Sequence, residues 1–206
     1  MKSIFSALAL AAAFSLPMAA HASVLPSGIQ YNVAASSVAA WGFTQCYSAL
    51  YNASGQSIST ILDGCKGDYL MLAARKVGTS EFFMLAAAND EDVTFATTGN
   101  TVHVANGVEW YFGLSQSWGF AGVGDVVSRN SCDTAGSGEI DRLCWHTSQG
   151  KMSGGYRAGS NYLNGSTTWE KVILRANVVN VPEPASLALF GLGLLGVAAG
   201  RRKRTP

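Results

Sequence analysis

Residues 101–110 have the sequence TVHVANGVEW, and this stretch decides the fold class of the chain. The alternation of apolar and polar residues over 101–105 is typical of a strand with one buried face. Asn106 and Gly107 follow, and both tolerate the positive φ angles of a tight two-residue turn. A second run rich in aromatic and β-branched residues, 108–114, continues directly after them. The stretch therefore predicts an antiparallel hairpin.

Short apolar runs of the same kind occur on both sides of this hairpin, separated by Gly, Asn, Asp and Ser. The clearest of them are 69–77, 82–87, 143–147 and 169–176. These spacings predict a mainly β fold, with residues 23–180 forming a single antiparallel β-sandwich or barrel-like domain. One short helix is expected at 57–62. The Gly-rich segments are expected to be turns; they are 119–125, 134–139 and 153–166.

The N-terminus has the composition of a secretory signal peptide. Lys2 supplies a positive charge, residues 4–16 are apolar, and Ala20 and Ala22 place small residues at the cleavage position. The apolar run has no polar face, which argues against a buried amphipathic helix. We therefore expect export, with signal peptidase removing residues 1–22.

The exported body is mildly acidic. Residues 23–183 carry 9 Lys and Arg and all 13 Asp and Glu, a net charge of −4, once Lys2 and the four basic residues at the C-terminus are set aside. A body of this charge, without a basic stripe, is not expected to bind nucleic acid.

All four cysteines lie in the exported body, at Cys46, Cys65, Cys132 and Cys144. An even number in an oxidising compartment predicts two disulfides, for which the sequence permits three connectivities. We favour local pairing, Cys46 with Cys65 and Cys132 with Cys144. A zinc site containing Cys144 and His146 is the less favoured alternative, because no C-x-x-C pair accompanies them.

The last residues, 181–206, have the sequence VPEPASLALFGLGLLGVAAGRRKRTP. As a helix, residues 187–200 are roughly 21 Å long, short of a bilayer core of about 30 Å. Including residues 185 and 186 and letting the arginines reach the headgroups narrows this mismatch, so we expect a spanning helix at 185–200. Pro182 and Pro184 prevent that helix from extending further upstream. Positive residues beside a spanning segment stay in the cytoplasm, so the body is expected on the other side of the membrane. These basic residues are Arg201, Arg202, Lys203 and Arg204.

This tail resembles the PEP-CTERM sorting signal. The resemblance covers the last 26 residues and is carried by Pro182-Glu183-Pro184, a Gly- and Leu-rich helix and a terminal basic cluster, in that order. It implies that an exosortase, a multi-pass membrane enzyme, cuts the tail near Pro182 to Pro184. The family is found in Gram-negative bacteria that make extracellular polysaccharide. A glycolipid-anchor signal also has a hydrophobic tail, but the terminal basic cluster argues against it.

The resemblance also implies a destination. We expect a precursor anchored in the inner membrane by helix 185–200, and then a mature protein at the cell surface or in the extracellular matrix. Extracellular polysaccharide is the expected partner of the body, in addition to signal peptidase and the exosortase. A purely structural matrix subunit and a secreted carbohydrate-active hydrolase are the alternatives.

Aromatic residues are frequent in the second half of the body. Alternate side chains of a strand point to opposite faces, so Tyr111 is expected on the face opposite Trp110 and Phe112. Exposed rings that stack on the C–H groups of sugars are common in polysaccharide-binding sites. The candidate ligand-binding residues are Tyr111, Trp118, Tyr156 and Tyr162. The alternative is that most of these rings fill the core.

Signals for catalysis are weak. The body contains two histidines, His103 and His146, and no motif typical of a nucleophilic hydrolase, a metalloprotease or a dinucleotide-binding protein. His103 lies opposite the valines of its strand and is expected to face solvent. The acidic run 89–92 lacks the spacing of a calcium loop and is expected to be a solvated turn. We therefore expect no enzymatic activity, metal or cofactor. A hydrolase would draw its carboxylate pair from Glu109, Asp125, Glu139 and Asp141.

Overall fold

A computed structural model of the protein describes residues 24–129, 133–135 and 138–178. The predicted signal peptide, Cys132 and the predicted sorting tail lie outside the described residues. No helix within the described ranges is long and apolar enough to cross a membrane. The spanning helix expected at 185–200 lies outside these ranges and stays a prediction.

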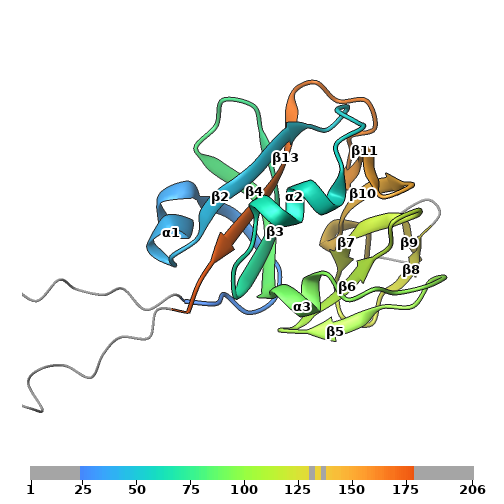
Figure 1. Cartoon of the computed structure of the whole chain (residues 1–206), viewed down its shortest axis with the longest axis horizontal. Coiled ribbons are helices and arrows are strands. Elements are labelled where there is room, and N and C mark those ends of the chain that lie inside the picture. Colours follow the sequence, from blue (N-terminus) through green and yellow to red (C-terminus); the bar gives the residue numbers. More distant parts are fainter. Residues whose placement is uncertain (1–23, 130–132, 136–137, 179–206) are drawn as a thin grey trace, which may run out of the picture.

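The described part of the chain is mainly β, as predicted, and its two large sheets are antiparallel (Figure 1). The five-stranded sheet contains, in spatial order, β1 (Gln30–Ala34), β4 (Glu81–Asn89), β3 (Tyr69–Lys76), β13 (Trp169–Ala176) and β2 (Thr44–Leu50). The six-stranded sheet contains β12 (Asn161–Tyr162), β11 (Lys151–Ala158), β10 (Leu143–Ser148), β7 (Ser117–Ala121), β6 (Val108–Phe112) and β5 (His103–Ala105). A third, two-stranded sheet pairs β8 (Val126–Ser128) with β9 (Asp133–Ala135). The helices are α1 (Ala35–Ala40), α2 (Ile58–Gly64), α3 (Asp90–Val93) and the 3₁₀ turn η1 (Gly138–Asp141).

The hairpin predicted at Asn106 and Gly107 is confirmed. β5 and β6 pair antiparallel on either side of the turn, and the two turn residues have φ angles of 49° and 74°. The Asn106 side chain also donates hydrogen bonds to the carbonyl oxygens of Pro26 and Ala87, at 2.7 and 2.9 Å. The turn therefore connects the six-stranded sheet to the N-terminal segment and to β4.

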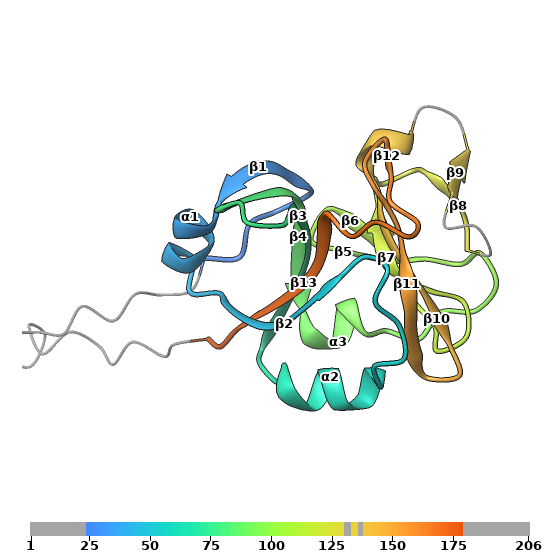
Figure 2. The same cartoon turned by 90° about the horizontal axis from the view of Figure 1, so that it is seen from above.

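The main hydrophobic core lies between the two large sheets, which face each other in Figure 2. The five-stranded sheet contributes aliphatic side chains such as Leu72, Met84 and Ile173, and the six-stranded sheet contributes aromatic ones such as Trp118 and Trp145. All five are completely buried. Because burial of apolar surface contributes roughly 25 cal/mol per Å², these large rings are a major source of stability.

A second core covers the outer face of the five-stranded sheet. Val38 of α1 and the nearby Phe43 pack with Met71, Leu85 and Val172 of the sheet. Strands β3 and β4 are consequently buried on both faces, which explains their continuous apolar sequences. Elements β1, β2 and α1 have no counterpart among the predicted elements.

The helix expected at 57–62 is confirmed as α2. Its N-cap is Ser57, whose hydroxyl oxygen accepts a hydrogen bond from the Thr60 backbone N–H. The turns predicted for the three Gly-rich segments are wrong in part, because 134–139 overlaps β9 and η1. Strand β7 extends into 119–125, and 153–166 contains most of β11 and all of β12.

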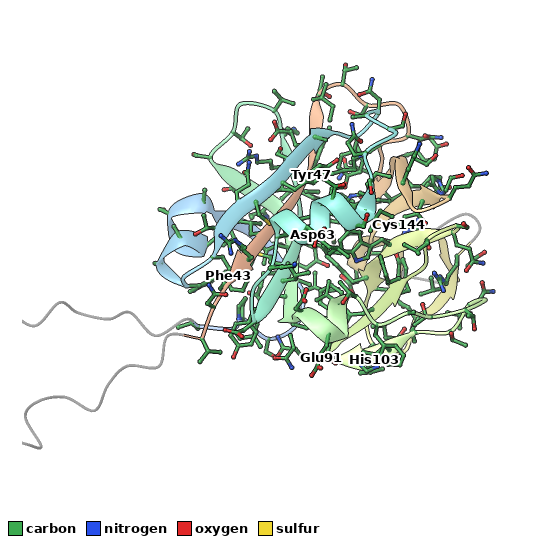
Figure 3. All side chains as sticks on the ribbon, viewed as in Figure 1. Phe43, Tyr47, Asp63, Glu91, His103 and Cys144 are labelled. Atoms are coloured by element: carbon green, nitrogen blue, oxygen red, sulfur yellow. A yellow bond between two sulfur atoms is a disulfide. The ribbon has the colours of Figure 1, made fainter. Side chains whose placement is uncertain are left out.

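A disulfide between Cys46 and Cys65 ties β2 to the C-terminal end of α2, as predicted. Its cysteines are 19 positions apart in the sequence. Cys144, labelled in Figure 3, is also disulfide-bonded; it lies in β10 and is completely buried. Its predicted partner, Cys132, lies outside the described residues.

The first and last described residues, Val24 and Val178, lie on the same side of the molecule (Figures 1 and 2). β13 is the last strand before Val178 and has a paired neighbour on each side, β3 and β2. The six-stranded sheet lies on the opposite side from both ends in the two views. Any partner bound there would therefore be held away from the start of the tail.

Candidate functional site

Two of the four predicted ligand-binding residues lie together at one edge of the six-stranded sheet. Tyr156 belongs to β11 and Tyr162 to the short edge strand β12. Antiparallel pairing of these strands brings the ring centroids to 5.2 Å, with an interplanar angle of 79°. Tyr162 is 60% exposed. One ring is therefore presented to solvent while its edge-to-face partner supports it from the sheet.

Arg157 contacts both rings. It lies directly opposite Tyr162 in the β11–β12 register, and its Cζ atom is 5.6 Å from the centroid of the Tyr156 ring and 5.7 Å from that of the Tyr162 ring. A guanidinium at such distances is attracted to the ring face. Sequence reasoning did not select Arg157, because only the cross-strand register shows its contact with Tyr162. The three residues Tyr156, Arg157 and Tyr162 are named the tyrosine patch below.

Polar side chains surround the tyrosine patch. The His146 ring packs against Tyr156 at 5.1 Å. Burial lowers the pKa of His146 below its usual value, and a hydrogen bond with the Gln116 backbone opposes this shift only in part. Burial therefore favours the neutral form of the imidazole. The side chain of Asn164 donates a hydrogen bond of 3.4 Å to the Tyr162 hydroxyl.

Tyr111 and Trp118 do not belong to this surface, because both are completely buried. The Tyr111 hydroxyl donates to the carbonyl oxygen of Leu143 at 3.0 Å, and Trp118 Nε1 donates to that of Val93 at 3.1 Å. Tyr111 packs in a third apolar cluster with Val127 of β8. The expectation that Tyr111 is presented to a ligand is therefore wrong, since both faces of β6 are covered.

The carboxylates considered for a hydrolase converge only in part. Glu109 is buried, and one of its oxygens accepts a backbone hydrogen bond at 2.8 Å. Asp125 and Asp141 both approach Gly122, where an added Cβ would lie 3.2 Å from Asp125 Oδ2 and 3.6 Å from Asp141 Oδ2. The side chain of Glu139 lies outside the described residues. Asp125 and Asp141 are therefore neighbours, whereas Glu109 is buried and bonded to the Gly124 backbone N–H.

Asp141, at the end of η1, contacts the five-stranded sheet. It accepts a hydrogen bond from the hydroxyl of Tyr31, which belongs to β1. Burial of Tyr31, followed by this hydrogen bond, raises the pKa of the Tyr31 phenol. The contact joins β1 to the end of η1, so Asp141 links the two sheets.

His103 faces solvent only in part, since its side chain is 29% exposed and has partners within the domain. Its Nε2 atom is 2.7 Å from Asp92 Oδ1, and its ring stacks on Phe95 with centroids 4.4 Å apart. The acidic run expected to be a turn forms the one-turn helix α3, which lies beside β5, as the labels of Glu91 and His103 show in Figure 3. His103 therefore helps to attach α3 to the edge of the six-stranded sheet.

The zinc alternative for Cys144 and His146 is not supported. Cys144 is disulfide-bonded, which removes the thiolate that a zinc ligand requires. In the described part of the chain, no group of three or more His, Cys, Asp or Glu side chains could hold a metal ion.

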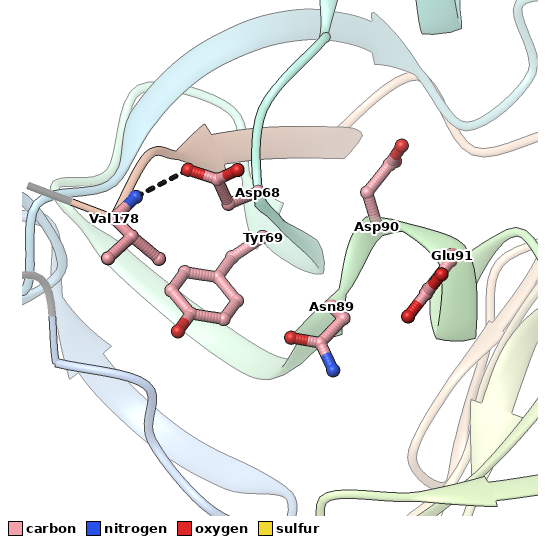
Figure 4. A pocket seen from close by; sticks show the side chains of 6 residues that line it. All are labelled: Asp68, Tyr69, Asn89, Asp90, Glu91 and Val178. Atoms are coloured by element: carbon pink, nitrogen blue, oxygen red, sulfur yellow. Dashed lines mark hydrogen bonds between the residues drawn. The ribbon is translucent and has the colours of Figure 1, made fainter.

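A polar pocket lies where the described chain ends (Figure 4). The Val178 backbone N–H donates a hydrogen bond of 2.6 Å to Asp68 Oδ2, and the Asp90 backbone N–H donates one of 3.0 Å to the Asp68 carbonyl oxygen. Burial, and then the charge of Glu91, raise the pKa of Asp90. The remaining lining residues are Tyr69 and Asn89. Asp68 thus holds the chain at the point from which the tail departs.

The residues that follow Val178 match a known sorting signal. A family model described as the PEP-CTERM protein-sorting motif matches residues 180–204. The chain carries a PEP-CTERM sorting tail. No curated protein and no solved structure matches the chain.

The PEP-CTERM tail indicates an exported protein that is processed by an exosortase, a membrane enzyme. The matched segment begins at residue 180, and Val178 is attached to the domain through Asp68.

Proposed function

We propose that this PEP-CTERM protein is a non-enzymatic surface or matrix protein whose β-domain associates with extracellular polysaccharide through the tyrosine patch. The observation that carries the proposal is the exposed Tyr162 ring, supported by Tyr156 and Arg157. The PEP-CTERM motif at residues 180–204 supports export and processing by an exosortase, and the choice of polysaccharide as partner follows from the resemblance described in the sequence analysis.

The chemistry of the tyrosine patch suits a sugar. The face of a phenol ring packs favourably on the apolar C–H groups of a pyranose, while its hydroxyl remains available to polar groups. The contacts of Arg157 with both rings reduce their freedom before a ligand arrives, which lowers the entropy cost of binding. Neighbouring amide groups, such as that of Asn164, are suited to sugar hydroxyls.

The proposed route has three steps. Signal peptidase removes residues 1–22 after export, and helix 185–200 holds the precursor in the inner membrane with its basic end in the cytoplasm. The exosortase then cuts near Pro182 to Pro184, and the mature protein reaches the cell surface or the matrix.

Binding by the tyrosine patch is tested with Tyr162→Ala and Tyr162→Phe in the full chain. Sedimentation with polysaccharide purified from the producing cells should show about tenfold weaker binding for Tyr162→Ala, because a ring–sugar contact is worth about 1 kcal/mol or slightly more. Tyr162→Phe keeps the ring and should bind almost as well as the unaltered protein. Val126→Ala, a similarly exposed site on β8, is the control for a general surface change. Equal binding by all four proteins would contradict the proposal.

A further inference from the structure

A second concave surface lies beside the turn that joins β3 to β4. This pocket has a volume of about 580 Å³. It is formed by β1, the β3–β4 turn and the start of β13, and none of its residues belongs to the tyrosine patch. Its lining residues are Asn32, Lys76, Gly78, Thr79, Ser80, Glu81, Phe83 and Trp169. It is named the hairpin pocket below.

The aromatic wall of the hairpin pocket is rigidly packed. The rings of Phe83 and Trp169 meet edge to face, with centroids 5.3 Å apart. Gly159 in the β11–β12 turn fits against Phe83 so closely that an added Cβ would lie 3.3 Å from the ring. The Lys76 ammonium lies 5.8 Å from the centroid of the Trp169 ring. Trp169 is only 7% exposed and belongs to the main core, so the partly exposed ring of Phe83 is the apolar face that the pocket offers, with the Lys76 cation nearby.

The strand position beside Phe83 is a backbone outlier, since Asn32 of β1 is the neighbour of Phe83 in the β1–β4 register. Asn32 lies within β1 and has a φ angle of 51°, although its neighbours Tyr31 and Val33 are paired with β4 in regular register. Non-glycine residues rarely adopt positive φ in a strand, and such residues cluster at functional sites. The strained residue is the one in β1 that lines the hairpin pocket. Its exposed amide adds a donor and an acceptor to the pocket wall.

The charges of the hairpin pocket select the class of ligand. Lys76 and Glu81 are exposed, and neither side chain has a hydrogen-bond or ion-pair partner among the residues that the structure describes. Together they leave the pocket without net charge. An anionic ligand would meet Glu81 and a cationic one would meet Lys76. Sugar hydroxyls, in contrast, both donate and accept, and hydrogen bonds to charged groups are stronger than those between neutral groups.

We propose that the hairpin pocket is a second saccharide-binding site, which takes an uncharged pyranose unit. The ring C–H groups would lie on Phe83, which Trp169 supports from the core, and the hydroxyls would bond to Asn32, Lys76 and Glu81. This inference rests on the proposed association of the domain with polysaccharide and adds a site distinct from the tyrosine patch. A chain with two separate sites binds a polymer more tightly than either site alone.

The test is calorimetric titration of the full chain with three neutral probes: cellohexaose, laminarihexaose and maltohexaose. The variant Lys76→Gln/Glu81→Gln removes both charges and keeps similar side-chain shapes. Its matched control is Lys66→Gln/Asp63→Asn, which removes one exposed Lys and one exposed Asp at another surface. At least one probe should bind the unaltered protein. The affinity of the pocket variant for that probe should be at least tenfold weaker. The affinity of the control variant should lie within twofold of that of the unaltered protein. Failure of all three probes to bind overturns the proposal.

A second variant, Asn32→Gly, removes the amide while glycine accepts the positive φ, so the fold is kept. It should also weaken binding, with no loss of thermal stability.

Tyr162→Ala separates this inference from the proposed function. If only Lys76→Gln/Glu81→Gln weakens the affinity for the oligosaccharide, the hairpin pocket is supported and the tyrosine patch does not bind that oligosaccharide. Weakening by Tyr162→Ala alone overturns the hairpin pocket and leaves the proposed function standing.

Discussion

Individual glycines determine how closely the strands of this protein can approach other groups. Gly155 in β11 lies against the ring of the completely buried Tyr51, and an added Cβ would overlap that ring. Gly119 in β7 meets the Leu143 carbonyl oxygen of β10 in the same way. Glycine within a strand marks such close approach. These residues made the surrounding sequence resemble turns, which explains why β7 and β11 were not predicted.

Replacement of Gly155 should be among the most damaging single changes. Gly155→Ala forces Tyr51 or β11 to move within a packed core, and we expect a loss of about 3 kcal/mol or more in the free energy of unfolding. Gly64→Ala is the matched control, because Gly64 ends α2 and has no atom within 4 Å of an added Cβ. It should leave stability unchanged or slightly higher. Urea unfolding of both variants measures the difference, and equal midpoints would contradict this account.

Lys171 is a second residue whose environment dictates a measurable property. It is completely buried in β13, and its ammonium donates a hydrogen bond of 2.6 Å to the Ala53 carbonyl oxygen. Burial lowers its pKa from 10.5 to about 8. Between these values the unfolded chain binds more protons than the folded one, so this residue makes stability rise as the pH increases from about 8 to 10.5.

Lys171→Met should remove that dependence. A shift of this size corresponds to about 3 kcal/mol, so the unaltered protein should gain up to about 3 kcal/mol relative to the variant between pH 7 and pH 11. The measurement is urea unfolding of both proteins at each pH. If the difference in unfolding free energy between the two proteins stays constant from pH 7 to pH 11, the buried ammonium keeps its ordinary pKa.

Among the elements, those with regular sequence periods were predicted and those defined by distant contacts were not. β13 has the predicted boundaries of 169–176, and the Asn106-Gly107 hairpin has the predicted turn. β1 and α1 lack a clear period, because their order depends on packing against the five-stranded sheet. For the site, Tyr156 and Tyr162 were selected from the sequence. Arg157 and the hairpin pocket depend on strand register and tertiary packing, which composition does not encode.

The disulfide between Cys46 and Cys65 joins two elements, and its contribution to stability can be measured by removing it. Cys46→Ala/Cys65→Ala opens a loop that the bond closes, and the chain-entropy estimate for such a loop is about 3 kcal/mol. We expect this loss of unfolding free energy in urea, together with faster proteolysis within α2. The unaltered protein after reduction should lose at least as much, because it also loses the Cys144 disulfide. A double variant as stable as the oxidised protein would show that packing of α2 suffices.

At the scale of the whole molecule, the basic end of the tail should control processing. Replacing Arg201, Arg202, Lys203 and Arg204 with Gln removes the charges that keep this end in the cytoplasm. Intact mass spectra of protein from membranes and medium should then show uncut precursor, whereas the unaltered protein should end near Pro182 to Pro184. Replacing Lys66 and Lys151 with Gln is the control, because both are exposed in the domain. Unchanged processing of the tail variant would contradict the assigned orientation.

The central position of β13 determines how the domain carries a mechanical load. A tether attached after Val178 pulls along β13, whose residues are paired with β3 on one side and with β2 on the other. Pulling along a strand held on both sides shears many backbone hydrogen bonds at once, whereas pulling an edge strand sideways breaks them in succession. Forced unfolding is governed by the height of that barrier rather than by equilibrium stability. A load applied after Val178 along β13 is therefore shared by the backbone hydrogen bonds to both neighbouring strands.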